Sequence, residues 1–283
     1  MQKGNVLVFL LILALFLGGT IEISEGSKTF GIILLLAALL ATSKIRVESP
    51  ENLLSGNHKI IMLLGLGIVL SDIVFNISSQ SRLGTLDIMT FLFGGSLIAY
   101  GTNNNELRRM GTFTAYMSAT FLVLFLVFFS LFGRLNINFT HIFDHYFVLL
   151  PVVSILHILQ VPIEVIGTET VRMAGVEDMS VVIGGPCSGL YSMFMLIGII
   201  VGYTKLEKFN NSHIYIMLLI TAVVAYTSNI FRITALYLVG HSYGSDTMMF
   251  VHTHLGWIIF TIVAGILLYI LNEMTRRKGI KYT

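Results

Sequence analysis

Residues 213 to 239 read HIYIMLLITAVVAYTSNIFRITALYLV, an apolar stretch whose one charged residue is Arg232. As an α-helix rising about 1.5 Å per residue, this stretch is long enough to cross about 30 Å of bilayer hydrocarbon. An arginine inside such a helix costs about 2.5 to 3.5 kcal/mol on translocon scales, so a functional or tightly paired role is the default expectation. The stretch predicts both a membrane helix and a polar site associated with it.

The composition of the whole chain indicates the same class of protein. Of its 283 residues, 55% are hydrophobic and 11% are charged, which is typical of a polytopic membrane protein. The net charge is +2, and no Lys/Arg-rich arm is present to bind nucleic acid. No small-residue cleavage pattern follows residues 5 to 21, so we expect a retained membrane helix there and not a cleaved signal peptide.

Apolar runs predict eight membrane-spanning helices. They lie near 5 to 21, 28 to 43, 59 to 77, 86 to 101, 111 to 133, 188 to 204, 213 to 239 and 254 to 272. A ninth run, 143 to 161, is less uniformly apolar because it includes His145, Pro151 and His157. Whether this ninth run spans the membrane decides the topology.

The distribution of Lys and Arg favours an external position for the ninth run. If 143 to 161 does not span, both termini are cytoplasmic, with twelve Lys and Arg in cytoplasmic segments and four outside. If it does span, whole basic clusters lie outside. We therefore predict an all-α polytopic protein of the cell membrane, with about eight transmembrane helices plus one external interfacial or re-entrant helix.

The expected organisation is a single integral membrane domain over 1–283. It comprises an N-terminal multi-span half, 1–142, and a catalytic half, 143–283, with an external loop at 162–186. We expect the acidic residues of that loop to form a solvated face; they are Glu164, Glu169, Glu177 and Asp178.

This topology brings three distinctive groups to the external side. Cys187 is the only cysteine, so it forms no intramolecular disulfide, and it lies at the external start of the helix at 188 to 204. If the next helix ends near Gly240, Arg232 lies about 12 Å below its external end, part of which a guanidinium can span by snorkelling. His252 is expected to open the last helix from the same side. A thiol, a guanidinium and an imidazole at one depth predict a thiol catalytic site.

Each of the three groups suits a step of nucleophilic catalysis. Free backbone N–H groups in the first turn of a helix favour the thiolate of Cys187. Arg232 is suited to stabilising the thiolate or an oxyanion, and His252 to moving the proton. Asn229 precedes Arg232 by three residues and shares its helical face, where it could orient Arg232 or contact substrate.

Other interpretations of these residues remain open. A lone cysteine in an apolar protein is often a small buried hydrophobe. A transporter or channel could use Arg232 and Asp72 to line a polar pathway, although no internal repeat of the kind common in transporters is visible. An envelope-complex scaffold would use the Cys187 region for packing alone.

Three short motifs resemble the exosortase and archaeosortase family of polytopic membrane transpeptidases. They are Pro186-Cys187-Ser188-Gly189-Leu190, then Asn229-Ile230-Phe231-Arg232, then His252-Thr253-His254-Leu255-Gly256-Trp257. The segment from Val161 to Gly185 also resembles the family's external segment of short extended pieces with glycine turns. The specific similarity covers about the last 120 residues.

The resemblance implies a cysteine transpeptidase that cleaves a C-terminal sorting signal of secreted proteins through a thioester. On this basis the catalytic residues are Cys187, Arg232 and His252, supported by Asn229, Ser188 and Gly189, with His254 as the alternative base. The implied partners are secreted proteins with a C-terminal motif, a membrane helix and a basic tail, and an amine acceptor on a lipid or envelope component. No cofactor is expected, and His252 with His254 is too small a set to predict a zinc site.

Overall fold

The computed structural model describes residues 58–79, 84–102, 104–183, 188–206 and 211–279, together with 15, 31–34 and 36–37. The expected spans at 5 to 21 and 28 to 43 lie almost wholly outside the described residues, as does the tetrapeptide 184–187. The chain divides into two compact units that interleave along the sequence. Unit 1 comprises 1–46, 131–192 and 222–283, and unit 2 comprises 47–130 and 193–221.

The described chain is mostly helical, which confirms the predicted class. Five helical segments are long and apolar enough to cross a membrane: 58–79, 107–134, 139–158, 214–243 and 245–271. Two shorter apolar helices, α4 (Thr85–Gly101) and α9 (Leu190–Leu206), coincide with two further expected spans. The segment 139–158 has a mean hydropathy of 1.5 and is among these five candidate spans, so the external position expected for 143 to 161 stays a prediction from the charge distribution.

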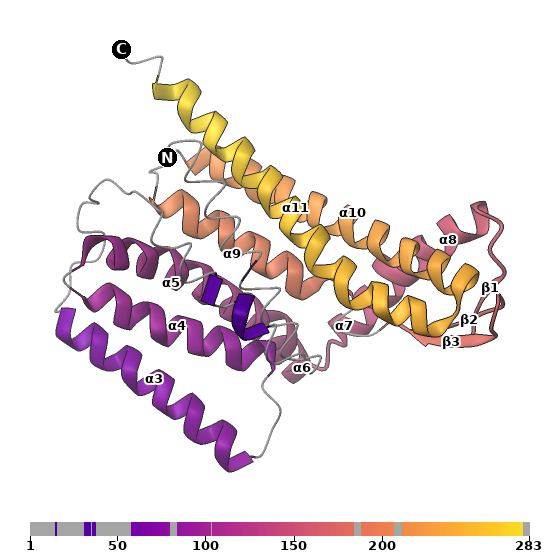
Figure 1. Ribbon diagram of the computed structural model, residues 1–283, viewed down its shortest axis with the longest axis horizontal. Helices are drawn as coiled ribbons and strands as arrows, with labels where there is room; N and C mark the ends of the chain where they lie inside the picture. Colours follow the sequence, from indigo (N-terminus) through magenta and orange to yellow (C-terminus); the bar gives the residue numbers. More distant parts are fainter. Residues whose placement is uncertain are drawn as a thin grey trace. The chain divides into compact units, whose positions relative to one another are not determined.

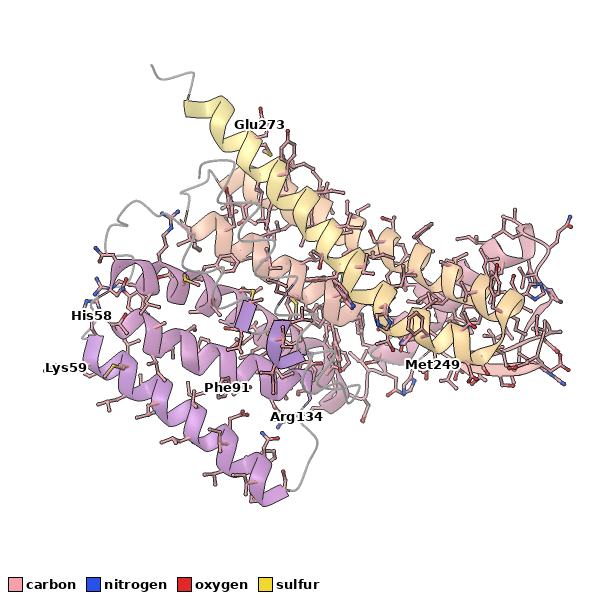
Figure 2. The ribbon with its side chains drawn as sticks, in the orientation of Figure 1. His58, Lys59, Phe91, Arg134, Met249 and Glu273 are labelled. Carbon is pink, nitrogen blue, oxygen red and sulfur yellow. The ribbon has the colours of Figure 1, made fainter. Side chains whose placement is uncertain are left out.

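Unit 2 is held together by close helix packing at glycines. It contains α3 (His58–Ser79), α4 and α5 (Asn105–Phe125). A Cβ added at Gly65 would lie 2.5 Å from the Gly94 carbonyl oxygen, and one added at Gly111 would lie 2.6 Å from the Tyr100 nitrogen. Small residues let helix backbones approach this closely, which is the usual basis of helix association in membranes. Figure 2 shows His58 and Lys59 at the start of α3, and Phe91 on α4.

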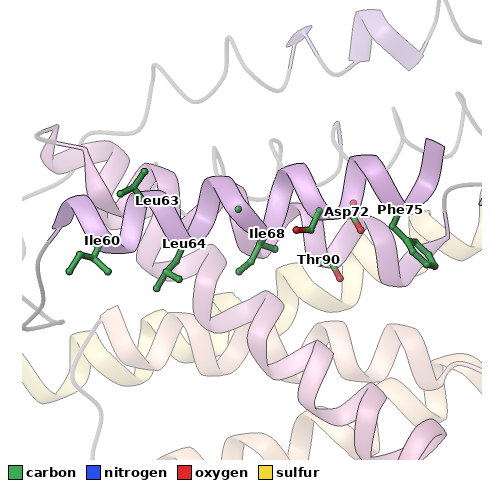
Figure 3. Close-up of a pocket in the computed structure, with 9 residues that line it drawn as sticks. Ile60, Leu63, Leu64, Ile68, Asp72, Phe75 and Thr90 are labelled. Atoms are coloured by element: carbon green, nitrogen blue, oxygen red, sulfur yellow. The ribbon is translucent and has the colours of Figure 1, made fainter. Parts of the chain in front are cut away.

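An open groove lies along α3 in unit 2 (Figure 3). Its lining is mainly aliphatic and aromatic, with Ile60, Leu64 and Phe75 among its members, but Asp72 and Thr90 also contribute. Asp72 is the one ionisable side chain in this lining. The groove is therefore an apolar surface with one acidic position.

The part of unit 1 from residue 131 starts with a short helix and is followed by a longer continuous helical segment. The π-helix η1 (Leu126–Leu131) runs into α6 (Phe132–Arg134) from unit 2. The segment then comprises α7 (Phe139–Ile142), the π-helix η2 (Phe143–Leu149) and α8 (Leu150–Ile158). Pro151 lies within this continuous helix and has no N–H, and the Phe147 carbonyl oxygen four residues earlier instead accepts the Tyr226 hydroxyl at 2.8 Å.

A three-stranded antiparallel sheet follows α8, within the segment Val161 to Gly185 where short extended pieces are expected, so the fold is not purely α-helical. The strands are β1 (Ile163–Val165), β2 (Thr170–Met173) and β3 (Met179–Val182), in the order β1-β2-β3. Side chains alternate between the faces, so Val171 and Met173 are buried whereas Arg172 is exposed. The buried face packs with α8 and α10 residues around Leu156, Ile233 and Tyr237. The sheet thus covers α8 and α10 at one end of unit 1.

Two long helices, whose adjoining parts belong to unit 1, form an antiparallel hairpin, as Figure 1 shows. They are α10 (Asn211–Tyr243) and α11 (Ser245–Gly279), and Gly244 between them has a φ of +84°, which favours glycine. α10 therefore ends beyond the predicted limit at 239, and α11 begins well before 254. Met249 lies near the turn and Glu273 near the other end of α11 (Figure 2).

The sheet is attached to the turn of this hairpin (Figure 1). The Val176 N–H donates to the His241 carbonyl oxygen at 3.1 Å, and His241 Nδ1 lies 2.9 Å from the Ala174 carbonyl oxygen. Glu177 accepts hydrogen bonds from the Ser245 hydroxyl at 2.9 Å and the Ser245 N–H at 3.2 Å. Glu177 is exposed, as expected for a solvated face, but its carboxylate also caps α11.

Candidate functional site

Ser188 and Asn229 connect the first two motifs. The Asn229 side-chain amide donates to the Ser188 carbonyl oxygen at 2.6 Å. Both residues are buried, with exposed fractions of 2% for Ser188 and 8% for Asn229. A buried hydrogen bond between segments 41 residues apart fixes the backbone that follows Cys187 against α10.

Gly189 makes this connection possible. Its φ of +84° lies in the left-handed region, and a Cβ added there would lie 2.4 Å from the Asn229 Cγ. Any larger residue would clash with Asn229 and would also strain the backbone. Position 189 therefore requires glycine, because the Asn229 side chain packs directly on its backbone.

Arg232 and Gly256 connect the second and third motifs. Arg232 lies twelve residues before Gly244, and Gly256 lies twelve residues after it. This symmetric spacing places them side by side in the hairpin, and a Cβ added at Gly256 would lie 3.2 Å from Arg232 Nη1. Gly256 thus leaves room for the guanidinium. Asn229 lies one helical turn from Arg232 on the same face of α10.

His252 occupies a different structural position from the one predicted. Because α11 begins at Ser245, His252 lies within the helix and does not open it. It precedes Gly256 by four residues, so it lies about 6 Å nearer the hairpin turn, close to the same helical face. His252 is therefore one helical turn away from Gly256, the residue of α11 that lies against Arg232.

His254 lies on another side of α11, as expected if the helix has already begun. Two residues turn a helix by about 200°, which separates the side chains of His252 and His254. The His254 Nδ1 atom lies 2.8 Å from the Phe250 carbonyl oxygen, and its ring packs on the Phe250 ring at 4.5 Å between centroids. These contacts hold His254 against its own helix.

Cys187 lies in the undescribed tetrapeptide 184–187, and the described residues that flank this tetrapeptide, Ile183 and Ser188, are buried. Ile183 precedes the undescribed tetrapeptide, and its N–H donates to the Glu169 carbonyl oxygen at 2.8 Å. Ser188 follows it. α9 begins at Leu190, so the predicted helix start at 188 is two residues too early.

Asp144 is a buried acidic residue beside this region that the sequence interpretation did not single out. It lies on η2, its exposed fraction is 0%, and among the described residues neither carboxylate oxygen has a hydrogen bond of ordinary geometry. His141, one turn earlier, pairs through Nδ1 with Glu169 of the loop between β1 and β2. Glu169 is therefore not simply solvated, in contrast to the expectation. The available signal was an aspartate within a run of mostly apolar residues.

The family of the chain follows from its match to the transmembrane exosortase family model, which extends over residues 21–269. The chain belongs to the transmembrane exosortase family. The match includes all three motifs and most of the N-terminal half, which confirms the family predicted from the motifs alone. No curated protein and no solved structure matches the chain.

Membership of this family identifies the chain as a multi-pass membrane protein of a transpeptidase family. Within unit 1, the described motif residues form a connected series from Ser188 through Asn229 and Arg232 to Gly256 and the adjacent turn of α11. Such a series offers a buried amide, a guanidinium and an imidazole in neighbouring positions. These are the group types that acyl transfer by a thiol requires.

Proposed function

We propose that the chain is a protein-sorting cysteine transpeptidase of the cell membrane, with its site on the external face and both termini cytoplasmic. Its substrates are secreted proteins that end in a short motif, a membrane helix and a basic tail. The observation that carries the proposal is the hydrogen bond between Asn229 and Ser188, because it joins two of the family-like motifs next to the lone cysteine.

In the first half of the reaction, the Cys187 thiolate attacks the carbonyl carbon of the scissile peptide bond. A C–S bond forms, the C–N bond breaks, and the tail leaves as an amine that takes a proton from His252. Arg232 stabilises the oxyanion of the tetrahedral intermediate, and loss of such a group costs about 100- to 1000-fold in rate.

In the second half, an amine of a lipid or envelope acceptor attacks the thioester. Its proton passes to His252, the C–S bond breaks, and the Cys187 thiolate is restored. The substrate is then joined to the acceptor by an amide bond. The proposed role of Arg232 in stabilising the oxyanion is supported by its surroundings, because Gly256 leaves space beside the guanidinium.

The proposal is tested by following removal of the tail from such a substrate in cells. Cys187→Ala and Cys187→Ser should both abolish processing while the protein remains inserted and abundant. Asp72→Leu, in the groove of unit 2, is the matched membrane variant and should process normally. Normal processing by Cys187→Ala would refute the proposal, and loss of processing in Asp72→Leu with an active Cys187→Ala would favour a polar transport pathway.

A further inference from the structure

Asp144 carries a cost in stability that packing does not explain. It is fully buried, and among the described residues no hydrogen bond of ordinary geometry reaches either carboxylate oxygen. Burying a polar group without a hydrogen bond costs about 1 to 3 kcal/mol, and a charged group costs more. An apolar side chain of similar size would avoid this cost. The carboxylate therefore calls for a role other than packing.

The position of Asp144 relative to Ser188 indicates that role. His141, one turn before Asp144, pairs with Glu169, and the Glu169 carbonyl oxygen accepts the N–H of Ile183, five residues before Ser188. On the other side, the Ser188 carbonyl oxygen is bonded to Asn229, one turn after Tyr226 in α10. The η2 helix that carries Asp144 is attached to α10, because the Tyr226 hydroxyl donates to the Phe147 carbonyl oxygen at 2.8 Å. Asp144 is thus held on a fixed element beside the residue that follows Cys187.

We propose that Asp144 is a positioning residue whose carboxylate accepts a hydrogen bond from the Ser188 hydroxyl. Ser188 is then held from two elements, by Asp144 of η2 through its hydroxyl and by Asn229 of α10 through its carbonyl oxygen. This inference rests on the proposed function, because its consequence is to fix the backbone adjoining the nucleophile. A displacement of about 1 Å in such a group lowers a reaction rate by up to about 100-fold.

The lone cysteine provides a readout that does not depend on activity. A maleimide reacts only with Cys187 in this chain, and the rate rises with the fraction of thiolate. Asp144→Asn and Asp144→Leu both remove the charge, but only asparagine retains an oxygen that accepts the Ser188 hydroxyl. The comparison of these two variants therefore isolates the hydrogen-bond acceptor.

The experiment measures substrate processing, membrane abundance, thermal stability and the pH midpoint of maleimide reaction in full-length protein. Asp144→Leu should be at least as stable as wild type yet process substrate up to about 100-fold more slowly, whereas Asp144→Asn should retain most processing. The pH at which the rate of maleimide reaction with Cys187 is half-maximal should be higher in Asp144→Leu than in Asp144→Asn. Ser188→Ala should match Asp144→Leu in processing, and the double variant should be no slower than either, because the two residues act as a unit.

Thr234→Val is the control for loss of a buried hydroxyl, because the Thr234 hydroxyl bonds only within its own helix, to the Ile230 carbonyl oxygen at 2.8 Å. It should leave processing and the maleimide midpoint unchanged. If Asp144→Leu lowered abundance, Ser188→Ala would carry the test, since it leaves the carboxylate in place. Wild-type processing in both Asp144→Leu and Ser188→Ala would overturn the inference. Continued processing by Cys187→Ala would instead refute the proposed function.

Discussion

The Asn229 side-chain amide hydrogen-bonds to the Ser188 carbonyl oxygen at 2.6 Å, and this bond ties the segment after Cys187 to the helix that carries Arg232. Asn229 is one helical turn from Arg232, so the same turn of α10 orients both the thiol segment and the guanidinium. The relative placement of the two motifs therefore depends on one buried amide.

Replacing Asn229 by Ala should lower both stability and processing. The substitution leaves the buried Ser188 carbonyl oxygen without its donor, which costs about 1 to 3 kcal/mol. Thermal unfolding in detergent, with processing in cells, measures the two effects. Thr227→Ala on the exposed side of the same helix is the control, because its hydroxyl bonds only to α10 carbonyl oxygens. Equal behaviour of Asn229→Ala and Thr227→Ala would contradict the assigned role.

Gly189→Ala should be more damaging than substitution of a helical glycine that has open space around it. The new Cβ would lie 2.4 Å from Asn229 Cγ at a φ of +84°, so backbone strain and a clash coincide. The control is Gly95→Ala in α4, where nothing lies within 4 Å of the added Cβ. We expect loss of processing for Gly189→Ala and a wild-type level for Gly95→Ala. The account would fail here if Gly189→Ala were fully active.

The two histidines of the third motif should differ sharply in their effect on activity. His252 lies one turn from the position that contacts Arg232, whereas His254 is held against Phe250 of its own helix. His252→Ala should lower processing by about 100- to 10,000-fold, as for loss of a general acid–base, and His254→Ala should have little effect. Time courses of processing at matched protein levels measure both. The reverse order of effects would assign the proton transfer to His254.

The contact between Glu177 and Ser245 should make stability depend on pH in the acidic range. Hydrogen bonds from the Ser245 hydroxyl and N–H lower the pKa of the Glu177 carboxyl below its ordinary value. The unfolded chain therefore binds this proton at a higher pH than the folded chain does. The stabilisation is complete above the ordinary glutamate pKa, and it is lost as pH falls through the lowered pKa.

Unfolding temperatures of wild type and Glu177→Gln at several pH values measure this contribution. Wild type should be the more stable at neutral pH, and the difference should disappear under strongly acidic conditions. Glu164→Gln, on the exposed face of β1, is the matched control and should show less pH dependence. A difference that is constant with pH would show that the carboxylate does not cap α11.

The sequence predicted the helical class and the order of the motifs because both depend on local patterns. It misplaced the ends of α10 and α11, since their last and first turns are polar and resemble a loop around His241 and Asp246. Recognising Gly244 as the turn would have predicted the pairing of Arg232 with Gly256 from symmetric spacing alone. An aspartate in a mostly apolar run marks Asp144 as unusual, but its burial depends on contacts of η2 with distant segments such as α10, which no local pattern indicates.

The most direct test of the central claim is capture of the acyl-enzyme with a tailed substrate in membranes depleted of acceptor amine. The account predicts a covalent adduct between the mature part of the substrate and the peptide containing Cys187. Hydroxylamine should release this adduct, and Cys187→Ala should not form it. An adduct on another residue, or processing that proceeds in Cys187→Ala, would contradict the claim that this membrane protein is a cysteine transpeptidase.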